Sequence, residues 1–320
     1  MSKPKVLITR RINQTALAPI QATCDIQQWD SDDAIPRATL LEWIAGMDGL
    51  YCLITDRIDA AVLDAAGPGL RVVSTMSVGY DHVDVAACKA RNVLVGNTPG
   101  VLTDTTADLT LALLLATARR LPESIEAVKS GEWSTWKPEW MTGRDLYGST
   151  VGIVGLGRIG AAVARRLTGF DCRLLYSGSA PKPDVAGPLQ AEYVDLDTLL
   201  AESDFVSLHC PLNAATQNLV NAAFLRKMKS TAILVNTTRG GVVDQDALYA
   251  ALVSGEIAAA GLDVTTPEPL PTDHPLLTLP NCVVLPHIGS ASIATRTKMA
   301  QMATDNLLAG VQGQPLPNPV

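Results

Sequence analysis

The chain has 320 residues, of which 47% are hydrophobic and 18% are charged. This composition is typical of a globular protein, and the length leaves room for two hydrophobic cores. The formal net charge of −7 comes without any basic stripe, so we expect no nucleic acid among the partners.

The cysteine spacing and the hydropathy of the chain indicate in which cellular compartment the protein lies. The six cysteines are scattered without CxxC or CxH spacing, which indicates the reduced thiols of an intracellular protein and no metal site. The first residues lead into the strand-like Val6-Leu-Ile-Thr9 without the apolar segment of a secretory signal. The longest apolar run, at residues 109–118, is too short to span a bilayer. We therefore expect a cytoplasmic protein without membrane contact.

Residues 1–97 alternate short apolar segments with helical patterns. This alternation predicts α/β units around a parallel sheet. The segment contains no GxGxxG sequence, so the first domain is not an obvious dinucleotide site. The expected strands are residues 6–8, 24–28, 49–53, 70–74 and 93–96, and the expected helices are residues 12–22, 38–44 and 59–66.

A helix is predicted over residues 103–120. Apolar residues cover nearly its whole circumference, as in a helix buried between domains or subunits. Residues 121–149 differ, because three of the chain's five tryptophans lie within eight residues, at Trp133, Trp136 and Trp140. Two interpretations are open: the tryptophans pack together locally, or they belong to an arm that buries them against a second subunit.

The sequence Gly155-Leu-Gly-Arg-Ile-Gly160 follows an apolar strand pattern and precedes a helical one. In that context GxGxxG is typical of dinucleotide binding. Gly155 permits the tight turn, Gly157 lets the backbone approach a pyrophosphate, and Gly160 lets the helix pack closely on the strand. The N–H groups at the helix N-terminus then bind the phosphates. A glycine-rich turn without a ligand is the alternative.

Further βα units surround this motif, with strands expected at residues 151–154, 172–176, 205–208, 231–236, 257–262 and 282–285. An amphipathic helix at residues 290–310 comes too late to complete the second sheet, so we expect it to pack on the first domain. The expected domains are residues 1–98 with 288–320, and residues 99–287 with the arm at about 121–149.

Arg239, Glu268 and His287 each come shortly after one of the last three predicted strands, and Asp263 is an alternative carboxylate to Glu268. Ligands bind at the carboxyl edge of a doubly wound sheet, so these side chains should converge beside the glycine motif. Structural alternatives exist for all of them. Arg239 could pair with Asp263 or Asp244, Glu268 could be merely exposed, and His287 could be a structural histidine.

The motifs in combination resemble those of the D-isomer-specific 2-hydroxyacid dehydrogenases, and most closely the glyoxylate/hydroxypyruvate reductases. They are, in chain order, Val78-Gly-Tyr-Asp-His82, Gly155-Leu-Gly-Arg-Ile-Gly160, His209-Cys-Pro211, Asn236-Thr-Thr-Arg-Gly240, Gly261-Leu-Asp-Val264, Pro267-Glu-Pro-Leu-Pro271 and Pro286-His-Ile-Gly-Ser290. The resemblance covers essentially the whole chain. It implies an α/β fold of two Rossmann-like, doubly wound parallel-sheet domains, with a discontinuous, flavodoxin-like substrate domain.

The resemblance also implies a catalytic set of Arg239, Glu268 and His287. In such a site Arg239 binds the carboxylate and carbonyl of a 2-oxo acid, His287 donates a proton to the carbonyl oxygen, and Glu268 orients the imidazole. A nicotinamide cofactor supplies the hydride. The implied substrate contacts are Val78, Gly79, Arg239, His287, Ser290 and, from the partner subunit of a homodimer, Trp136, with Trp140 as the next choice.

The cofactor contacts expected from the glycine motif, the following strand and the resemblance are Gly155, Leu156, Gly157, Arg158, Ile159, Gly160, Ser177, Gly178, Ser179, Lys182, Cys210, Pro211, Thr216, Thr237, Thr238, Asp263, His287 and Gly289. No carboxylate stands at residues 177–183, where an NAD enzyme usually places one for the ribose 2′-OH. The hydroxyls there and Lys182 suit a 2′-phosphate instead, although Gly178 and Ser179 stand where an arginine is expected. We therefore predict a preference for NADPH, with NADH as an option.

The predicted reaction is the NAD(P)H-dependent reduction of glyoxylate to glycolate and of hydroxypyruvate to D-glycerate. A dehydrogenase for another D-2-hydroxy acid is one alternative, although Glu268 argues against a formate dehydrogenase. A cofactor-sensing co-repressor on the same scaffold is the other, and the absence of long disordered tails with interaction motifs weighs against it.

Overall fold

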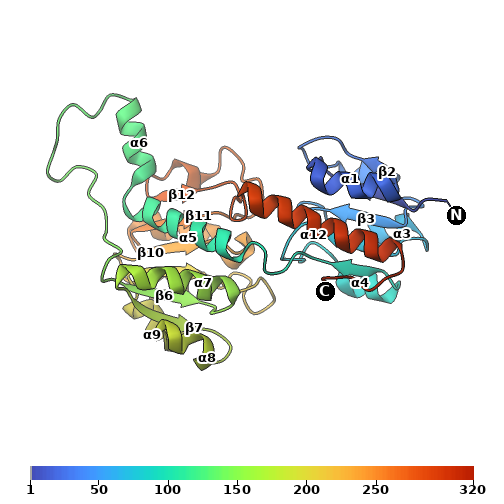
Figure 1. Cartoon of the computed structure of the whole chain (residues 1–320). Helices are drawn as coiled ribbons and strands as arrows, with labels where there is room; N and C mark the ends of the chain where they lie inside the picture. The colour runs from blue at the N-terminus through green and yellow to red at the C-terminus, as the bar shows by residue number, and fades with distance from the viewer. Residues whose placement is uncertain (1) are drawn as a thin grey trace. The chain divides into compact units, whose positions relative to one another are not determined.

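The computed structural model describes residues 2–320. The chain forms two compact units, one comprising the residues up to Leu102 together with Ser290–Val320, and the other Thr103–Gly289 (Figure 1). All paired strands in both sheets run parallel. The prediction of two parallel-sheet α/β domains is thereby confirmed.

Unit 1 contains a five-stranded sheet of order β2-β1-β3-β4-β5, which is the flavodoxin-like order. Its strands are β1 Lys5–Ile8, β2 Asp25–Gln28, β3 Gly49–Cys52, β4 Val72–Thr75 and β5 Leu94–Gly96. Its helices are α1 Gln14–Thr23, α2 Arg37–Trp43, α3 Ala60–Ala66, α4 Val85–Ala90 and α12 Ile293–Val311. The sequence did not predict α4, because six residues are too few for a helical period.

Alternation along the strands of unit 1 divides its apolar residues between two cores. Leu7 packs with α2 and α3 on one face of the sheet, whereas Val6 and Ile8 pack with α12 on the other. The close approach of α12 depends on Gly310, since a Cβ atom there would lie 2.5 Å from the side chain of Val72. The C-terminal helix is therefore an integral part of unit 1.

Unit 2 contains a seven-stranded sheet of order β12-β11-β10-β9-β6-β7-β8. Its strands are β6 Thr150–Val154, β7 Arg173–Ser177, β8 Glu192–Tyr193, β9 Phe205–Leu208, β10 Ile233–Asn236, β11 Ala259–Leu262 and β12 Cys282–Val284. Its α-helices are α5 Thr103–Ala118, α6 Leu121–Lys129, α7 Arg158–Leu167, α8 Pro183–Ala186, α9 Leu196–Glu202, α10 Ala222–Leu225 and α11 Gln245–Ser254. Short 3₁₀ helices lie at η1 Thr168–Phe170, η2 Gly187–Leu189, η3 Gly240–Val242 and η4 Pro275–Thr278.

The topology of unit 2 places a ligand crevice beside β6. The chain runs outward from β6 through β7 to β8, and then returns to β9 on the other side of β6. This reversal is the topological switch point of a Rossmann-like sheet, where ligands bind outside the carboxyl ends of the strands. Helices α5 and α7 cover one face of the sheet (Figure 1). Residues of α9, α10 and α11 pack on the other face.

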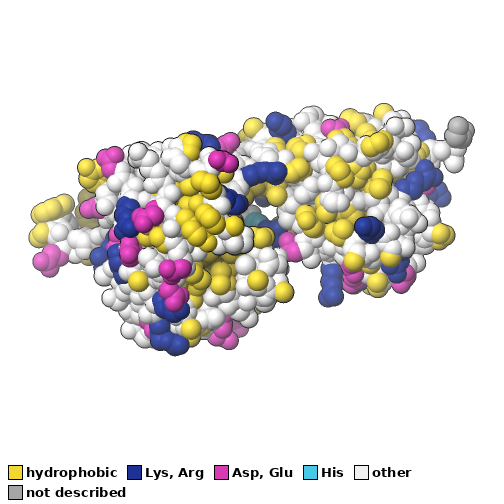
Figure 2. Space-filling model, turned by 90° about the horizontal axis from the view of Figure 1, so that it is seen from below, with side chains coloured by type: hydrophobic (Ala, Val, Ile, Leu, Met, Phe, Trp, Pro, Cys, Tyr) yellow, Lys and Arg dark blue, Asp and Glu magenta, His cyan; other side chains and the backbone are white. Residues whose placement is uncertain are grey.

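The arm begins with α6 and continues as an irregular segment to β6, which Figure 1 shows as a long loop that leaves the body of unit 2. Trp133 and Trp136 are 61% and 80% exposed. The interpretation that the tryptophans pack together locally is therefore wrong for these two. Figure 2 shows hydrophobic side chains at the far left of the molecule, where this arm lies.

Among residues 2–320, no helix combines the length and the apolar character that crossing a lipid bilayer requires.

Candidate active site

The glycine loop, residues 155–160, joins β6 to α7 at the switch point of unit 2. Gly155 has φ +99°, and a Cβ atom there would lie 2.8 Å from the backbone of His209 and Cys210. A Cβ atom on Gly160 would lie 2.3 Å from the carbonyl oxygen of Gly155. Both positions therefore require glycine. Nothing lies within 4 Å of a Cβ built on Gly157, so the loop has an open face.

This geometry fits a dinucleotide. Helix α7 begins at Arg158, directly after the open glycine, so the N–H groups of its first turn have no carbonyl partner within the helix. Their partial positive charge faces the open side of the loop, where a pyrophosphate would be bound.

The end of β7 provides the polar groups expected for the adenosine ribose. Ser177 is buried, and its carbonyl oxygen accepts a hydrogen bond from the N–H of Gly155. Lys182 folds back toward the glycine loop: its Nζ lies 3.1 Å from the carbonyl oxygen of Leu156, and its backbone N–H donates to the hydroxyl of Tyr176. An ammonium group is thus held beside the glycine loop.

Arg239 follows β10 in a turn that the side chain of Asn236 holds together. The Nδ2 atom of Asn236 donates to the carbonyl oxygen of Arg239, at 2.9 Å, and its Oδ1 atom accepts from the N–H and hydroxyl of Thr238. Asn236 is fully buried, so water does not compete for these bonds. This role of Asn236 could not be predicted from the sequence, because an Asn at a strand end is a common turn residue.

Glu268 and His287 form a direct pair. His287 Nδ1 lies 2.8 Å from Glu268 Oε2, and Glu268 Oε1 accepts a hydrogen bond from the N–H of Thr265 at 2.9 Å. Burial favours a higher pKa for Glu268, but the hydrogen bond and charge of His287, the Thr265 N–H and the charge of Arg239 outweigh it and lower that pKa. The carboxylate is thus ionised and fixed on both oxygens.

Asp263 has a different role from Glu268. It is 1% exposed, and its carboxylate oxygens accept hydrogen bonds from the N–H groups of Ile288 and Gly289, each at 2.8 Å. Burial raises its pKa above the ordinary value, despite these hydrogen bonds and the charge of His287. His287 has φ +54°, in the left-handed region that costs free energy for a residue with a Cβ atom. The bonds from Asp263 hold the backbone that follows His287 in place.

The structure shows how three of the charged residues are engaged. Asp263 accepts hydrogen bonds from the backbone after His287, and Asp244 caps α11 by accepting from the N–H of Ala247. Glu268 is engaged rather than merely exposed, since it contacts His287.

The other expected cofactor contacts of unit 2 also follow carboxyl ends of its strands. Cys210 and Pro211 come directly after His209 beyond β9, and Thr216 lies in the same connection with its hydroxyl donating to Pro211 O. Thr237 comes directly after β10 and is buried against Thr110 of α5, at 2.9 Å between their hydroxyls. The structure therefore places all of them at the edge of the sheet that carries the glycine loop.

Some expected substrate contacts lie outside this edge. Val78 and Gly79 follow β4 in unit 1, and Ser290 belongs to the C-terminal segment of the same unit. Trp136 lies on the exposed arm.

His209 is a feature that the sequence analysis weighed only weakly. Its Nε2 atom lies 2.8 Å from the hydroxyl of Ser207, and its Nδ1 atom is buried without a hydrogen-bond partner within residues 2–320. Burial lowers its pKa to about 4, so the ring is neutral at physiological pH. Its position directly after an apolar strand, in His209-Cys-Pro211, was the available signal.

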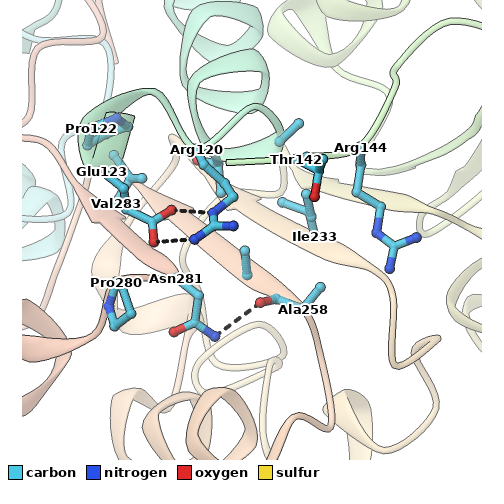
Figure 3. Close-up of a pocket in the computed structure, with 14 residues that line it drawn as sticks. Arg120, Pro122, Glu123, Thr142, Arg144, Ile233, Ala258, Pro280, Asn281 and Val283 are labelled. Carbon is cyan, nitrogen blue, oxygen red and sulfur yellow. Dashed lines mark hydrogen bonds and ion pairs between the residues drawn. The ribbon is translucent and has the colours of Figure 1, made fainter. Parts of the chain in front are cut away.

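A cavity of about 420 Å³ lies at the opposite edge of the same sheet, beside the first residues of β10 and β11 (Figure 3). Arg120 and Glu123 face each other across part of it, with 2.7 Å between Nε and Oε2. Because its wall includes Ile233 and Ala259 at the amino ends of the strands, this cavity is separate from the glycine loop and His287.

Comparison with known proteins shows the family of the chain. Residues 111–289 match the family model for the D-isomer specific 2-hydroxyacid dehydrogenase, NAD binding domain. A human protein named glyoxylate reductase/hydroxypyruvate reductase is 56% identical over 318 residues, which cover 98% of this chain and 97% of that protein.

Two solved structures extend the comparison to the fold. A crystal structure of a protein from Thermus thermophilus superposes with a TM-score of 0.91 at 48% identity and covers 99% of both chains. A crystal structure of an NADPH-dependent glyoxylate/hydroxypyruvate reductase from Sinorhizobium meliloti, in complex with NADP and malonate, gives a TM-score of 0.86 at 34% identity, covering 100% of this chain and 97% of that one. The chain therefore belongs to the D-isomer-specific 2-hydroxyacid dehydrogenase family.

Proposed function

We propose that this enzyme uses NADPH to reduce small 2-oxo acids, glyoxylate to glycolate and hydroxypyruvate to D-glycerate. The observation that carries the proposal is the contact between His287 Nδ1 and Glu268 Oε2, at 2.8 Å, on the sheet edge that also holds the glycine loop. The similarity to reductases named for these two substrates supports the choice of 2-oxo acid.

The proposed mechanism divides the work among three side chains. Nε2 of His287 donates a proton to the carbonyl oxygen, because Nδ1 is committed to Glu268. The Glu268 carboxylate stabilises the positive charge on the imidazole and fixes its orientation. The planar guanidinium of Arg239 offers paired donors to the substrate's carboxylate and carbonyl. A nicotinamide cofactor, when bound, would supply the hydride that the carbonyl carbon accepts.

The remaining substrate contacts come from unit 1 and from a partner subunit in this proposal. The N–H groups of Val78 and Gly79 bind the substrate carboxylate, and Ser290 contributes a hydroxyl. Trp136 of a second copy closes the substrate pocket. Residues up to Leu102 with Ser290–Val320 then serve as the substrate-binding domain, and Thr103–Gly289 as the dinucleotide-binding domain.

A preference for NADPH is supported by Lys182. Its ammonium group lies 3.1 Å from Leu156 O, beside the glycine loop, and no carboxylate occupies residues 177–183. A 2′-phosphate would find a cation there, whereas the ribose 2′-OH of NADH would find no carboxylate acceptor.

We also propose a homodimer that uses the arm. Leu121, Ile125 and Val128 are spaced along one face of α6 and are 47%, 56% and 57% exposed. Together with Trp133 and Trp136 they form an apolar surface that a second copy would cover. Light scattering of the wild type and of Ile125→Glu tests this: we expect a dimer that the substitution weakens, and a monomeric wild type would contradict it.

We infer a cytoplasmic location from the cysteines. All six are free thiols, although the chain carries enough of them for three disulfides. Fractionation of the source cells with an antibody to the protein would test this.

The main proposal is tested by a panel of 2-oxo acids assayed with NADPH and with NADH. We expect the highest kcat/KM for glyoxylate and hydroxypyruvate with NADPH, and D-glycerate as the product of the second. His287→Ala should lower kcat by roughly 10²- to 10⁴-fold with NADPH binding intact. A protein that binds NADPH but reduces no member of the panel would be a cofactor-sensing binding protein instead.

A further inference from the structure

The loop that follows β4, residues 77–79, has an unusual division of its backbone groups. The carbonyl oxygens of Val78 and Gly79 both accept hydrogen bonds from side chains of unit 1. Val78 O accepts from Asn97 Nδ2 at 2.8 Å, and Gly79 O accepts from Ser77 Oγ at 2.7 Å. The N–H groups of Val78 and Gly79, by contrast, have no acceptor among residues 2–320. The loop therefore has free N–H donors while its carbonyl oxygens are already bonded, as a backbone that binds an anion requires.

A chain of hydrogen bonds extends from Gly79 O into the unit. Ser77 Oγ lies 2.8 Å from Thr75 Oγ1, and Thr75 Oγ1 lies 2.9 Å from His82 Nε2. The direction of each bond follows from the first. A carbonyl oxygen only accepts, so the one hydroxyl hydrogen of Ser77 is used on Gly79 O. Thr75 must then donate to Ser77, and its own oxygen must accept from His82.

The proton on His82 follows from the same count of hydrogens. Its Nε2 atom must carry hydrogen, because the hydroxyl hydrogen of Thr75 is already committed to Ser77. Thr75 is fully buried and Ser77 is 4% exposed, so water does not replace either hydroxyl when it is lost. The backbone of His82 is itself anchored, since its carbonyl oxygen accepts from the N–H of Ile58.

We propose that His82 is a positioning residue for the substrate carboxylate. Acting through Thr75 and Ser77, it keeps the Gly79 carbonyl turned inward, so that the N–H groups of Val78 and Gly79 stay available to an anion. The inference rests on the proposed function, in which this loop binds the carboxylate of a 2-oxo acid. It gives a functional role to a histidine that the sequence analysis interpreted as structural.

Three substitutions test the chain by steady-state kinetics with glyoxylate and NADPH. Ser77→Ala removes the donor to Gly79 O, and His82→Leu removes the donor that fixes Thr75. Each should raise the KM for glyoxylate about five- to tenfold with little change in kcat, because the carboxylate is bound equally in the ground and transition states. His82→Gln retains an N–H donor and should restore a KM near that of the wild type. The Kd for NADPH should stay unchanged in all three.

Ser74→Ala is the matched control. Ser74 lies on β4, the strand before the loop, and is fully buried. Like Ser77 it donates to a backbone carbonyl oxygen at 2.7 Å, here that of Ala303, but it lies outside the loop. This variant should lose a similar amount of thermal stability and keep the wild-type KM.

The outcomes separate the two proposals. A wild-type enzyme that does not reduce glyoxylate overturns the proposed function. An active wild type whose KM is unchanged by Ser77→Ala and His82→Leu, or is raised equally by Ser74→Ala, overturns only the role of His82. If His82→Leu does not fold, the KM values of Ser77→Ala and Ser74→Ala decide whether this hydrogen-bonded chain supports substrate binding.

Discussion

His287 Nδ1 lies 2.8 Å from Glu268 Oε2, although the histidine follows β12 and the glutamate lies in the connection before it. The pairing leaves Nε2 as the ring nitrogen that can meet a substrate. It also keeps a negative charge beside the imidazole, since the second oxygen of Glu268 is held by the N–H of Thr265. The proton donor and the group that stabilises its charge are therefore set by two contacts.

Removing the charge of Glu268 tests this relationship. Glu268→Gln should lower kcat/KM for glyoxylate by roughly 10- to 100-fold, because the amide no longer stabilises the protonated ring. The pH at which reduction falls to half on the alkaline side should move lower. Glu123→Gln, a matched change in the ion pair with Arg120 far from this edge, should alter neither quantity. An unshifted pH profile in Glu268→Gln would contradict the assigned role.

The hydrogen bonds that Asp263 accepts from the N–H groups of Ile288 and Gly289 predict a second effect on His287. Asp263→Asn retains one acceptor but turns an NH₂ group toward a backbone N–H, so one bond is lost. The loss of one buried hydrogen bond should cost about 1–3 kcal/mol of unfolding free energy. We also expect kcat to fall while the KM for glyoxylate changes less, measured alongside thermal unfolding. Equal kcat in the variant and the wild type would show that the backbone after His287 needs no such support.

Lys182 should decide between the two nicotinamide cofactors. Lys182→Ala removes the cation beside Leu156 O, and we expect kcat/KM with NADPH to fall about tenfold while the value with NADH stays the same. Lys227→Ala, which removes an exposed lysine paired with Asp197, is the control. An equal fall in kcat/KM with NADPH and with NADH would mean that Lys182 stabilises the glycine loop and does not bind the 2′-phosphate.

His209 gives a prediction for acid stability. Burial lowers its pKa to about 4, below the ordinary value near 6.5, so the unfolded chain binds a proton that the folded chain does not. The contribution of this group is complete above pH 6.5 and is lost as the pH falls toward 4, at up to about 1.4 kcal/mol per pH unit. Urea unfolding at a series of pH values should show a shallower slope across this range in His209→Gln. If the unfolding free energy changed equally steeply with pH in both proteins, a group other than His209 would be responsible for the change.

Much of this architecture follows from local patterns. The apolar strands and the Gly155-x-Gly157-x-x-Gly160 spacing predicted both sheets and the dinucleotide loop, because periodicity and the steric needs of glycine act over a few residues. The order of elements also indicated which residues come after strands. Arg239, His287 and one of the carboxylates Asp263 and Glu268 could be named on that ground, since parallel strands bring their carboxyl ends to one edge.

Other features depended on contacts between segments distant in the chain. The sequence left Glu268 and Asp263 as alternatives, and only the folded connection showed that the first meets His287 and the second bonds the backbone of Ile288 and Gly289. Likewise, Asn97, directly after β5, donates a hydrogen bond to the carbonyl oxygen of Val78 after β4. The periodicity of either strand alone does not predict this contact.

The sequence by itself determined the fold class, the family and the chemical types at the site, because these depend on short motifs and on local periodicity. The tertiary structure alone decided the pairing of each carboxylate, the exposure of Trp136 and the direction of the hydrogen bonds from His82 to Gly79. Those properties depend on distances between side chains that are set only once the strands are packed side by side.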